Sequence, residues 1–232
     1  KRSPITVLYF MRLLFFTLQF LPYIPLKTFS FMHDKSNEYY KLASRALMQK
    51  RIIEVVGYDP QWAEAYRTES IAVQDVLKGL DVRLHHIGST SVPGLMAKPV
   101  IDILIEANDV AELDGYDAAM KAIGYVPKGE FGIPGRRFYL KGLYDRTHHV
   151  HAFNRGTTDV FRHLAFKDYL IAHPDIAGEY GALKAKLADM CNNDNDTYCD
   201  GKTGFVQEHE KKALAWQACQ QGGPADRASR GH

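Results

Sequence analysis

Apolar and polar positions alternate in short blocks through the middle of the chain, and these blocks predict strands and helices in turn. After Pro60, apolar residues recur at near-helical spacing as far as Leu80, which predicts a first helix over 60–80. β-branched or alternating runs predict strands at 52–56, 82–87, 100–105, 137–140 and 148–153. Further helical patterns cover 111–123, 158–172, 176–190 and 204–218. The predicted class is mixed α/β, with a central sheet, flanking helices and a helical C-terminal third.

The two ends of the chain do not follow this pattern. Residues 7–26 are nearly all apolar and long enough to span a bilayer, but Arg12 and two prolines shorten the apolar core, and no signal-peptidase site follows. We therefore expect an upstream or disordered apolar leader, with a membrane anchor at 7–26 as the alternative. The C-terminal end is small, polar and aperiodic, which is typical of disorder. The predicted division is a leader at 1–47, a folded domain at 48–220 that starts at Met48, and a disordered tail at 221–232.

Composition narrows the classes of function. The chain has 232 residues, of which 46% are hydrophobic and 24% are charged, so it can bury a sizeable core. Its 29 basic and 27 acidic residues leave a formal charge of +2, which is too small for bulk nucleic-acid binding. The three cysteines form no CxxC pair of the kind that zinc sites use, and their odd number suits a reducing cytoplasm.

Residues 85–106 contain the densest group of candidate functional side chains. Gly88 and Ser89, with Thr90 beside them, follow a predicted strand directly, where exposed amides and a hydroxyl can hold a phosphate oxygen. Asp102 interrupts the apolar run of the next strand, and a buried carboxylate costs free energy unless a cation or donors pair with it. The pattern predicts a phosphate-binding turn beside a cation-binding aspartate. The alternative is a tight turn and a structural aspartate whose hydrogen bonds are satisfied.

Two histidines are candidates for the same cation. His149 and His151 alternate with Val150 on a predicted strand, so both imidazoles face one side. If that strand neighbours Asp102, the three side chains could form a His, His, Asp site, which suits zinc or manganese better than magnesium. The alternative is that these histidines hydrogen-bond a phosphate or the helices that cover the sheet.

Basic residues lie close to the same segments. Lys98 stands between the turn and the aspartate, and Arg136 and Arg137 follow a glycine-proline turn. Guanidinium groups bind phosphate through two parallel hydrogen bonds, so we expect at least one arginine to neutralise a triphosphate. Weaker candidates, on helices where most charges belong to the solvated face, are Arg162, Lys167 and Lys184.

Long stretches of the sequence resemble the GrpB family. They are YDPQW at 58–62, HIGSTSVPGLMAKPVIDI at 86–103, GIPGRRF at 132–138, HHVH at 148–151 and HLAFKDYLIAHP at 163–174. The resemblance covers roughly residues 52–218. It implies a nucleotidyltransferase-like fold, in which a glycine-serine turn and strand carboxylates bind a nucleoside triphosphate through a divalent metal, magnesium or manganese.

One position departs from the pattern of that superfamily. Its transferases usually present two carboxylates spaced two residues apart, but the partner position of Asp102 holds Leu104. A single aspartate would hold magnesium only weakly before the nucleotide arrives. Glu106 shares the face of Asp102 but is expected at the solvent end of the strand.

Two functions therefore stay open. The first is metal-dependent transfer of a nucleotidyl group from a nucleoside triphosphate to an unknown acceptor. In it Ser89 and the turn amides bind phosphate, Asp102 binds the metal and Arg137 binds the departing pyrophosphate. The second is a non-catalytic accessory module that binds a nucleotide or another phosphorylated small molecule.

Overall fold

The structure, a computed structural model, describes residues 52–142 and 145–221, and these contain one five-stranded sheet in the order β1-β2-β5-β4-β3. Strands β2 and β5 are parallel, and the other neighbouring pairs are antiparallel, so the sheet is mixed. The strands are β1 (Val82–Ile87), β2 (Ile101–Ala107), β3 (Tyr125–Pro127), β4 (Arg137–Lys141) and β5 (His148–Asn154).

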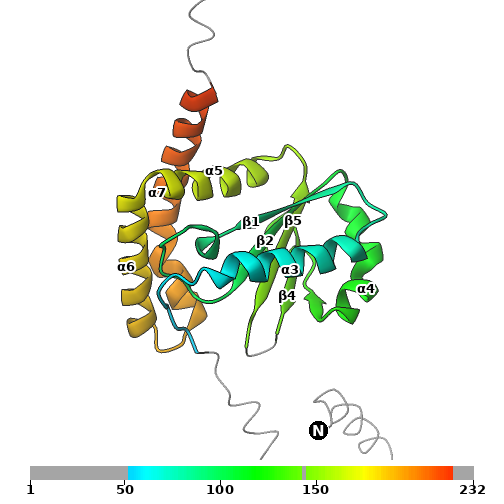
Figure 1. Cartoon of the computed structure of the whole chain (residues 1–232), viewed down its shortest axis with the longest axis horizontal. Helices are drawn as coiled ribbons and strands as arrows, with labels where there is room; N and C mark the ends of the chain where they lie inside the picture. The colour runs from blue at the N-terminus through cyan, green and yellow to red at the C-terminus, as the bar shows by residue number, and fades with distance from the viewer. Residues whose placement is uncertain (1–51, 143–144, 222–232) are drawn as a thin grey trace, which may run out of the picture. The chain divides into compact units, whose positions relative to one another are not determined.

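Helices cover both faces of this sheet (Figure 1). Between β2 and β3 the chain forms a 3-10 helix, η2 (Val110–Tyr116), and one short α-helix, α4 (Asp117–Ala122). A single 3-10 turn, η1 (Ser89–Ser91), follows β1. The longer helices are α3 (Gln61–Val76), α5 (Thr158–Ala172), α6 (Pro174–Met190) and α7 (Asn195–Gln221).

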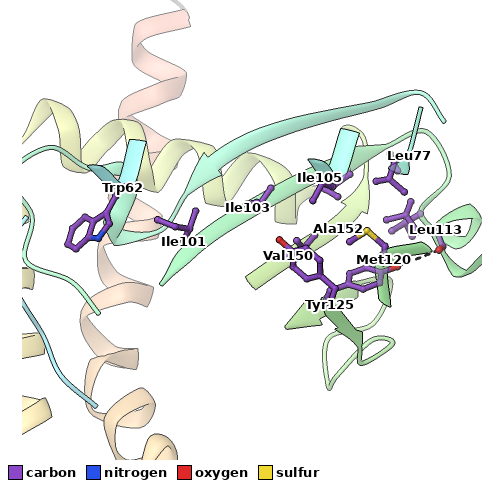
Figure 2. Close-up of a cluster of buried hydrophobic side chains, with 14 of the residues drawn as sticks. Trp62, Leu77, Ile101, Ile103, Ile105, Leu113, Met120, Tyr125, Val150 and Ala152 are labelled. Atoms are coloured by element: carbon purple, nitrogen blue, oxygen red, sulfur yellow. Dashed lines mark hydrogen bonds between the residues drawn. The ribbon is translucent and has the colours of Figure 1, made fainter. Parts of the chain in front are cut away.

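One face of the sheet packs against α3, η2 and α4. Ile101, Ile103 and Ile105 alternate along β2 and are 3%, 0% and 0% exposed, because successive strand residues point to opposite faces. Burying each such side chain stabilises the fold by roughly 1.5–3 kcal/mol. The side chains that surround them (Figure 2) are Trp62, Leu77, Leu113, Met120, Tyr125, Val150 and Ala152.

The opposite face packs against α5. Ile87, Leu104 and Phe153 form a second cluster there with Val160 of α5. Because Asp102 lies two residues before Leu104, it points to this face as well. Helices α6 and α7 extend the layer, and their core also takes in two residues of the segment after β1, Val92 and Leu95. The C-terminal helices are thereby packed against the glycine-serine turn.

The predicted fold class is confirmed: the protein has a central mixed sheet, flanking helices and a helical C-terminal third. The bounds predicted for β1 and α5 are those observed. The strand predicted at 52–56 was wrong, since Val56 forms only an isolated bridge with Ala97. The first half of the predicted helix 111–123 is 3-10 helix and the second half is α4, and β3 was not predicted because it is three residues long.

The loop predicted before the last helix is shorter than expected. Asn192 and Asn193 adopt positive φ angles of 47° and 58° and turn the chain, after which Asp194 accepts a hydrogen bond from the Thr197 amide. Helix α7 therefore begins at Asn195. Within the described residues no helix is both long and apolar enough to cross a membrane. The predictions for 1–47 and 222–232 lie outside the described residues.

Candidate functional site

Asp102, His149 and His151 converge where β2 and β5 begin. The parallel register pairs Asp102 with His149 and Leu104 with His151. His149 Nδ1 donates to Asp102 Oδ1 at 3.0 Å, and His151 Nε2 lies 3.8 Å from the same oxygen. One potential ligand atom from each residue lies within 4.8 Å of the other two. The structure thus brings together the three residues that the sequence proposed for a metal.

The charges of this cluster suit a cation. Burial alone would raise the pKa of Asp102, but hydrogen bonds and charge from His149 and His151 together lower it well below its ordinary value. Burial lowers the pKa of His151, against the opposing effect of Asp102. An ionised carboxylate beside a neutral imidazole is the protonation state in which such a pair binds a metal.

The donor atoms present fit a divalent transition metal better than magnesium. Nε2 of His149 and Nδ1 of His151 are buried and have no hydrogen-bond partner among the described residues. These nitrogens point away from Asp102, so an ion held by its carboxylate would instead be coordinated by the nitrogens that face it, His149 Nδ1 and His151 Nε2. The residues two positions before and after Asp102 are Val100 and Leu104, so the strand adds no second carboxylate there. Two nitrogens and one oxygen are ligands typical of zinc or manganese sites.

Gly88 brings the backbone against this aspartate. Its φ of 69° and ψ of −173° belong to a region that essentially only glycine adopts. A Cβ at this position would lie 3.0 Å from Asp102 Cβ and would overlap the carboxylate. The Ser91 hydroxyl donates to the Gly88 carbonyl at 2.6 Å and closes the turn. The Thr90 hydroxyl donates to the Val100 carbonyl at 3.3 Å, so it fixes the turn from within the core.

Lys184 of α6 reaches the turn from the other side. It is 2% exposed, its Nζ donates to Ser89 Oγ at 2.7 Å, and it lies 4.4 Å from the Tyr180 ring centre. Burial and the neighbouring lysines, Lys202 before Lys98, lower the pKa of Lys184 to about 7. A buried lysine beside a serine hydroxyl, with two partly exposed lysines near it, is a suitable environment for an anion.

The sequence contained a signal that Lys184 is buried, although we expected this residue on the solvated face of its helix. Ala177, Tyr180 and Gly181 precede it at helical spacing and all face the core, and Gly181 packs against Met96 in the segment after the turn. A lysine on the buried stripe of a helix needs a polar partner, which Ser89 provides.

The two predicted arginines are placed differently from each other. Arg136 is buried near His151, and its positive charge contributes to the lowered pKa of that imidazole. Arg137 faces the opposite side of the sheet, where it forms two hydrogen bonds with Asp114 at 2.6 and 2.8 Å. The structure therefore does not bring Arg137 to the cluster, because Phe138 occupies the position of β4 paired with His151.

A third imidazole lies beside the cluster. The His163 ring of α5 is centred 5.7 Å from that of His151 and 6.0 Å from Phe153. Burial lowers the pKa of His163 to about 3, so it is neutral at physiological pH. His163 is thus a side chain of α5 that packs against the metal-binding candidates.

Comparisons with known proteins identify relatives over most of the described residues. The family model described as GrpB protein matches residues 52–212. UPF0157 protein YqkA of Bacillus subtilis is 43% identical over 171 residues, which make up 74% of this chain and 50% of YqkA. UPF0157 protein SCO7215 of Streptomyces coelicolor is 37% identical over 165 residues, covering 70% of this chain and 85% of that protein.

A solved structure shares the fold. The crystal structure of conserved protein GrpB from Enterococcus faecalis matches with a TM-score of 0.69 and 41% identity, over 71% of this chain and 99% of that one. The matched region thus amounts to nearly the whole of one relative and to half of the length of another.

Proposed function

The chain belongs to the GrpB family, and from this membership and the geometry of its site we propose that it binds a nucleoside triphosphate through a divalent metal and transfers the nucleotidyl group to an acceptor. The observation that supports this most strongly is the convergence of Asp102, His149 and His151 beside the Gly88 backbone. A metal site next to a turn that can bind phosphate is what such a transfer requires.

Asp102, His149 and His151 would hold the metal, and we propose manganese or zinc because two of the three ligands are nitrogens. When bound, the metal polarises a phosphoryl oxygen and offsets the charge of the triphosphate. Asp102 is already ionised in the free protein, so binding a cation does not require removing its proton.

The turn and the lysines would seat the phosphates. The Ser89 hydroxyl accepts a hydrogen bond from Lys184, and Lys98 adds positive charge near Lys184. In the transfer, an acceptor oxygen bonds to the α-phosphorus, the bond from the α-phosphorus to the α,β-bridging oxygen breaks, and pyrophosphate leaves with that electron pair while the proton of the acceptor passes to solvent. We assign Lys184 the role that the sequence had suggested for Arg137.

A second function is favoured by one observation. With Val100 and Leu104 on either side of Asp102, the strand offers one carboxylate where two-metal transferases need two. A protein with this site could bind a nucleotide, or another phosphorylated small molecule, as an accessory module without turning it over.

Pyrophosphate release distinguishes the two functions. The protein is incubated with each of the four nucleoside triphosphates, with manganese, zinc or magnesium, and with a set of hydroxyl compounds as acceptors, and nucleotide affinity is measured by calorimetry. His151→Gln removes a proposed ligand, and His85→Gln is the control, because His85 contacts Glu106 at 2.5 Å and lies outside the cluster. We expect release by the wild type and the control but not by His151→Gln. Binding without release would support the accessory module, and no binding would refute both.

A further inference from the structure

Phe131 is an exposed aromatic side chain held in an unusual backbone conformation. The residue is 61% exposed, and its φ of 45° is uncommon for a bulky side chain. Residues in such conformations persist only where the surrounding structure fixes them, and they concentrate at ligand-binding sites.

The loop around Phe131 is fixed by its own neighbours. Arg136 donates from Nε to the Glu130 carbonyl at 3.1 Å and from its guanidinium to the Phe131 carbonyl at 2.7 Å. Glu130 in turn accepts a hydrogen bond from the Gly135 amide at 2.7 Å. These contacts fix the backbone of the loop around Phe131. Two nitrogens of the Arg136 guanidinium, Nε and one terminal nitrogen, are thereby bonded to the loop backbone.

A continuous series of rings connects Phe131 with the metal-binding candidates. Phe131 stacks on Phe138 with centroids 5.4 Å apart and planes inclined by 19°. Phe138 is 6% exposed and lies 4.9 Å from the His151 ring and 5.6 Å from the His149 ring. One face of the Phe131 ring is covered by this stack, and because the residue is 61% exposed its other face is open to solvent.

We propose that the outer face of Phe131 is the platform on which the base of the bound nucleotide stacks. This rests on the proposed function, because it assigns the part of the nucleotide that the metal and the lysines do not contact. Every nucleobase has a π-face, so a single exposed ring recognises the aromatic class of ligand without selecting among the four bases. Lys184 of α6 and Lys98 of the loop before β2 would bind the phosphates, and Phe131 of the loop before β4 would bind the base.

The test separates base recognition from phosphate recognition. Affinities for a nucleoside triphosphate and for inorganic tripolyphosphate are measured by calorimetry in the presence of manganese. Phe131→Gly removes the ring and suits the positive φ, so its Tm should match that of the wild type. Phe131→Tyr keeps the platform. Phe161→Leu is the control, because Phe161 is a comparably exposed phenylalanine on α5, at 51%.

We expect Phe131→Gly to bind the nucleoside triphosphate at least about tenfold more weakly and to bind tripolyphosphate as the wild type does. Phe131→Tyr and Phe161→Leu should bind both ligands normally. Unchanged nucleotide affinity in Phe131→Gly would overturn the platform while leaving the proposed function standing, and so would an equal loss for both ligands. Failure of the wild type to bind either ligand would overturn the proposed function and the platform with it.

Discussion

At the scale of single residues, the two functions assign the most different roles to Asp102. It is ionised, it accepts from His149 and it touches the backbone of Gly88. In a transferase such a carboxylate is indispensable for the cation. In a metal-free binding module it would repel every phosphate that approached.

Asp102→Asn should therefore affect a different measured quantity under each of the two functions. If the protein is a transferase, we expect pyrophosphate release to fall by about a hundredfold or more while the fold is kept. If it is a binding module, nucleotide affinity without metal should stay the same or improve. Calorimetry with and without manganese, beside the release assay, measures both. The control is Asp75→Asn, at an exposed position of α3, which should alter neither.

The lowered pKa of Lys184 should make the folded protein more stable as the pH rises. Its pKa is about 7 in the folded protein and ordinary when unfolded, so keeping it charged inside costs on the order of 4–5 kcal/mol at low pH. Between these two pKa values, Lys184 holds a proton in the unfolded chain but not in the folded chain. The contribution of Lys184 therefore makes the wild type more stable as the pH rises from about 7 towards 10. Lys98 and Lys202 strengthen the effect, and Asp102 opposes it.

We therefore expect Lys184→Met to be more stable than the wild type at pH 6 in the absence of phosphate, despite losing the bond to Ser89, which contributes about 1 kcal/mol. The difference should shrink steadily up to pH 9. Denaturant titrations at each pH measure it, and adding tripolyphosphate should stabilise only the wild type. A difference independent of pH would contradict a charged, buried Lys184.

At the scale of elements, the turn between β1 and β2 depends on Gly88 for two separate reasons, its positive φ and its contact with Asp102. Gly94 shares only the first, because its φ is 78° and a Cβ there would meet nothing within 4 Å. Each alanine substitution should destabilise the protein by about 1–3 kcal/mol through backbone strain. We expect only Gly88→Ala to abolish manganese binding, as measured by calorimetry. Equal metal binding in both variants would show that the turn does not position Asp102.

The sequence predicted which side chains share one face of a strand, but it did not predict which strands lie next to each other. Alternation along one strand was enough to place His149 and His151 on one side, since that depends on local geometry alone. Their position opposite Asp102 depends on the β2–β5 register, which is set by packing between distant segments. For the same reason Arg137 was expected at the site, although Phe138 takes the face of β4 that points there.

At the scale of the whole molecule, the family domain corresponds to a nearly complete protein in one relative, since 99% of the Enterococcus faecalis GrpB chain is matched. We therefore expect a shortened chain beginning at Met48 to be soluble, with a Tm within a few degrees of that of the full chain. Thermal denaturation followed by circular dichroism compares the two. A product that is insoluble or melts much earlier would show that residues 1–47 support the domain.

The parallel pairing of β2 with β5 also has a consequence for the order of events during folding. Asp102 and His149 are 47 residues apart in sequence, and Ser89 and Lys184 are 95 apart. Closing such long loops costs entropy that early folding steps do not recover, so the site is expected to assemble after the transition state. Manganese should then slow unfolding in stopped-flow experiments and leave the refolding rate unchanged. In the newly made chain, any ion that Asp102, His149 and His151 hold would then bind only after the sheet is complete.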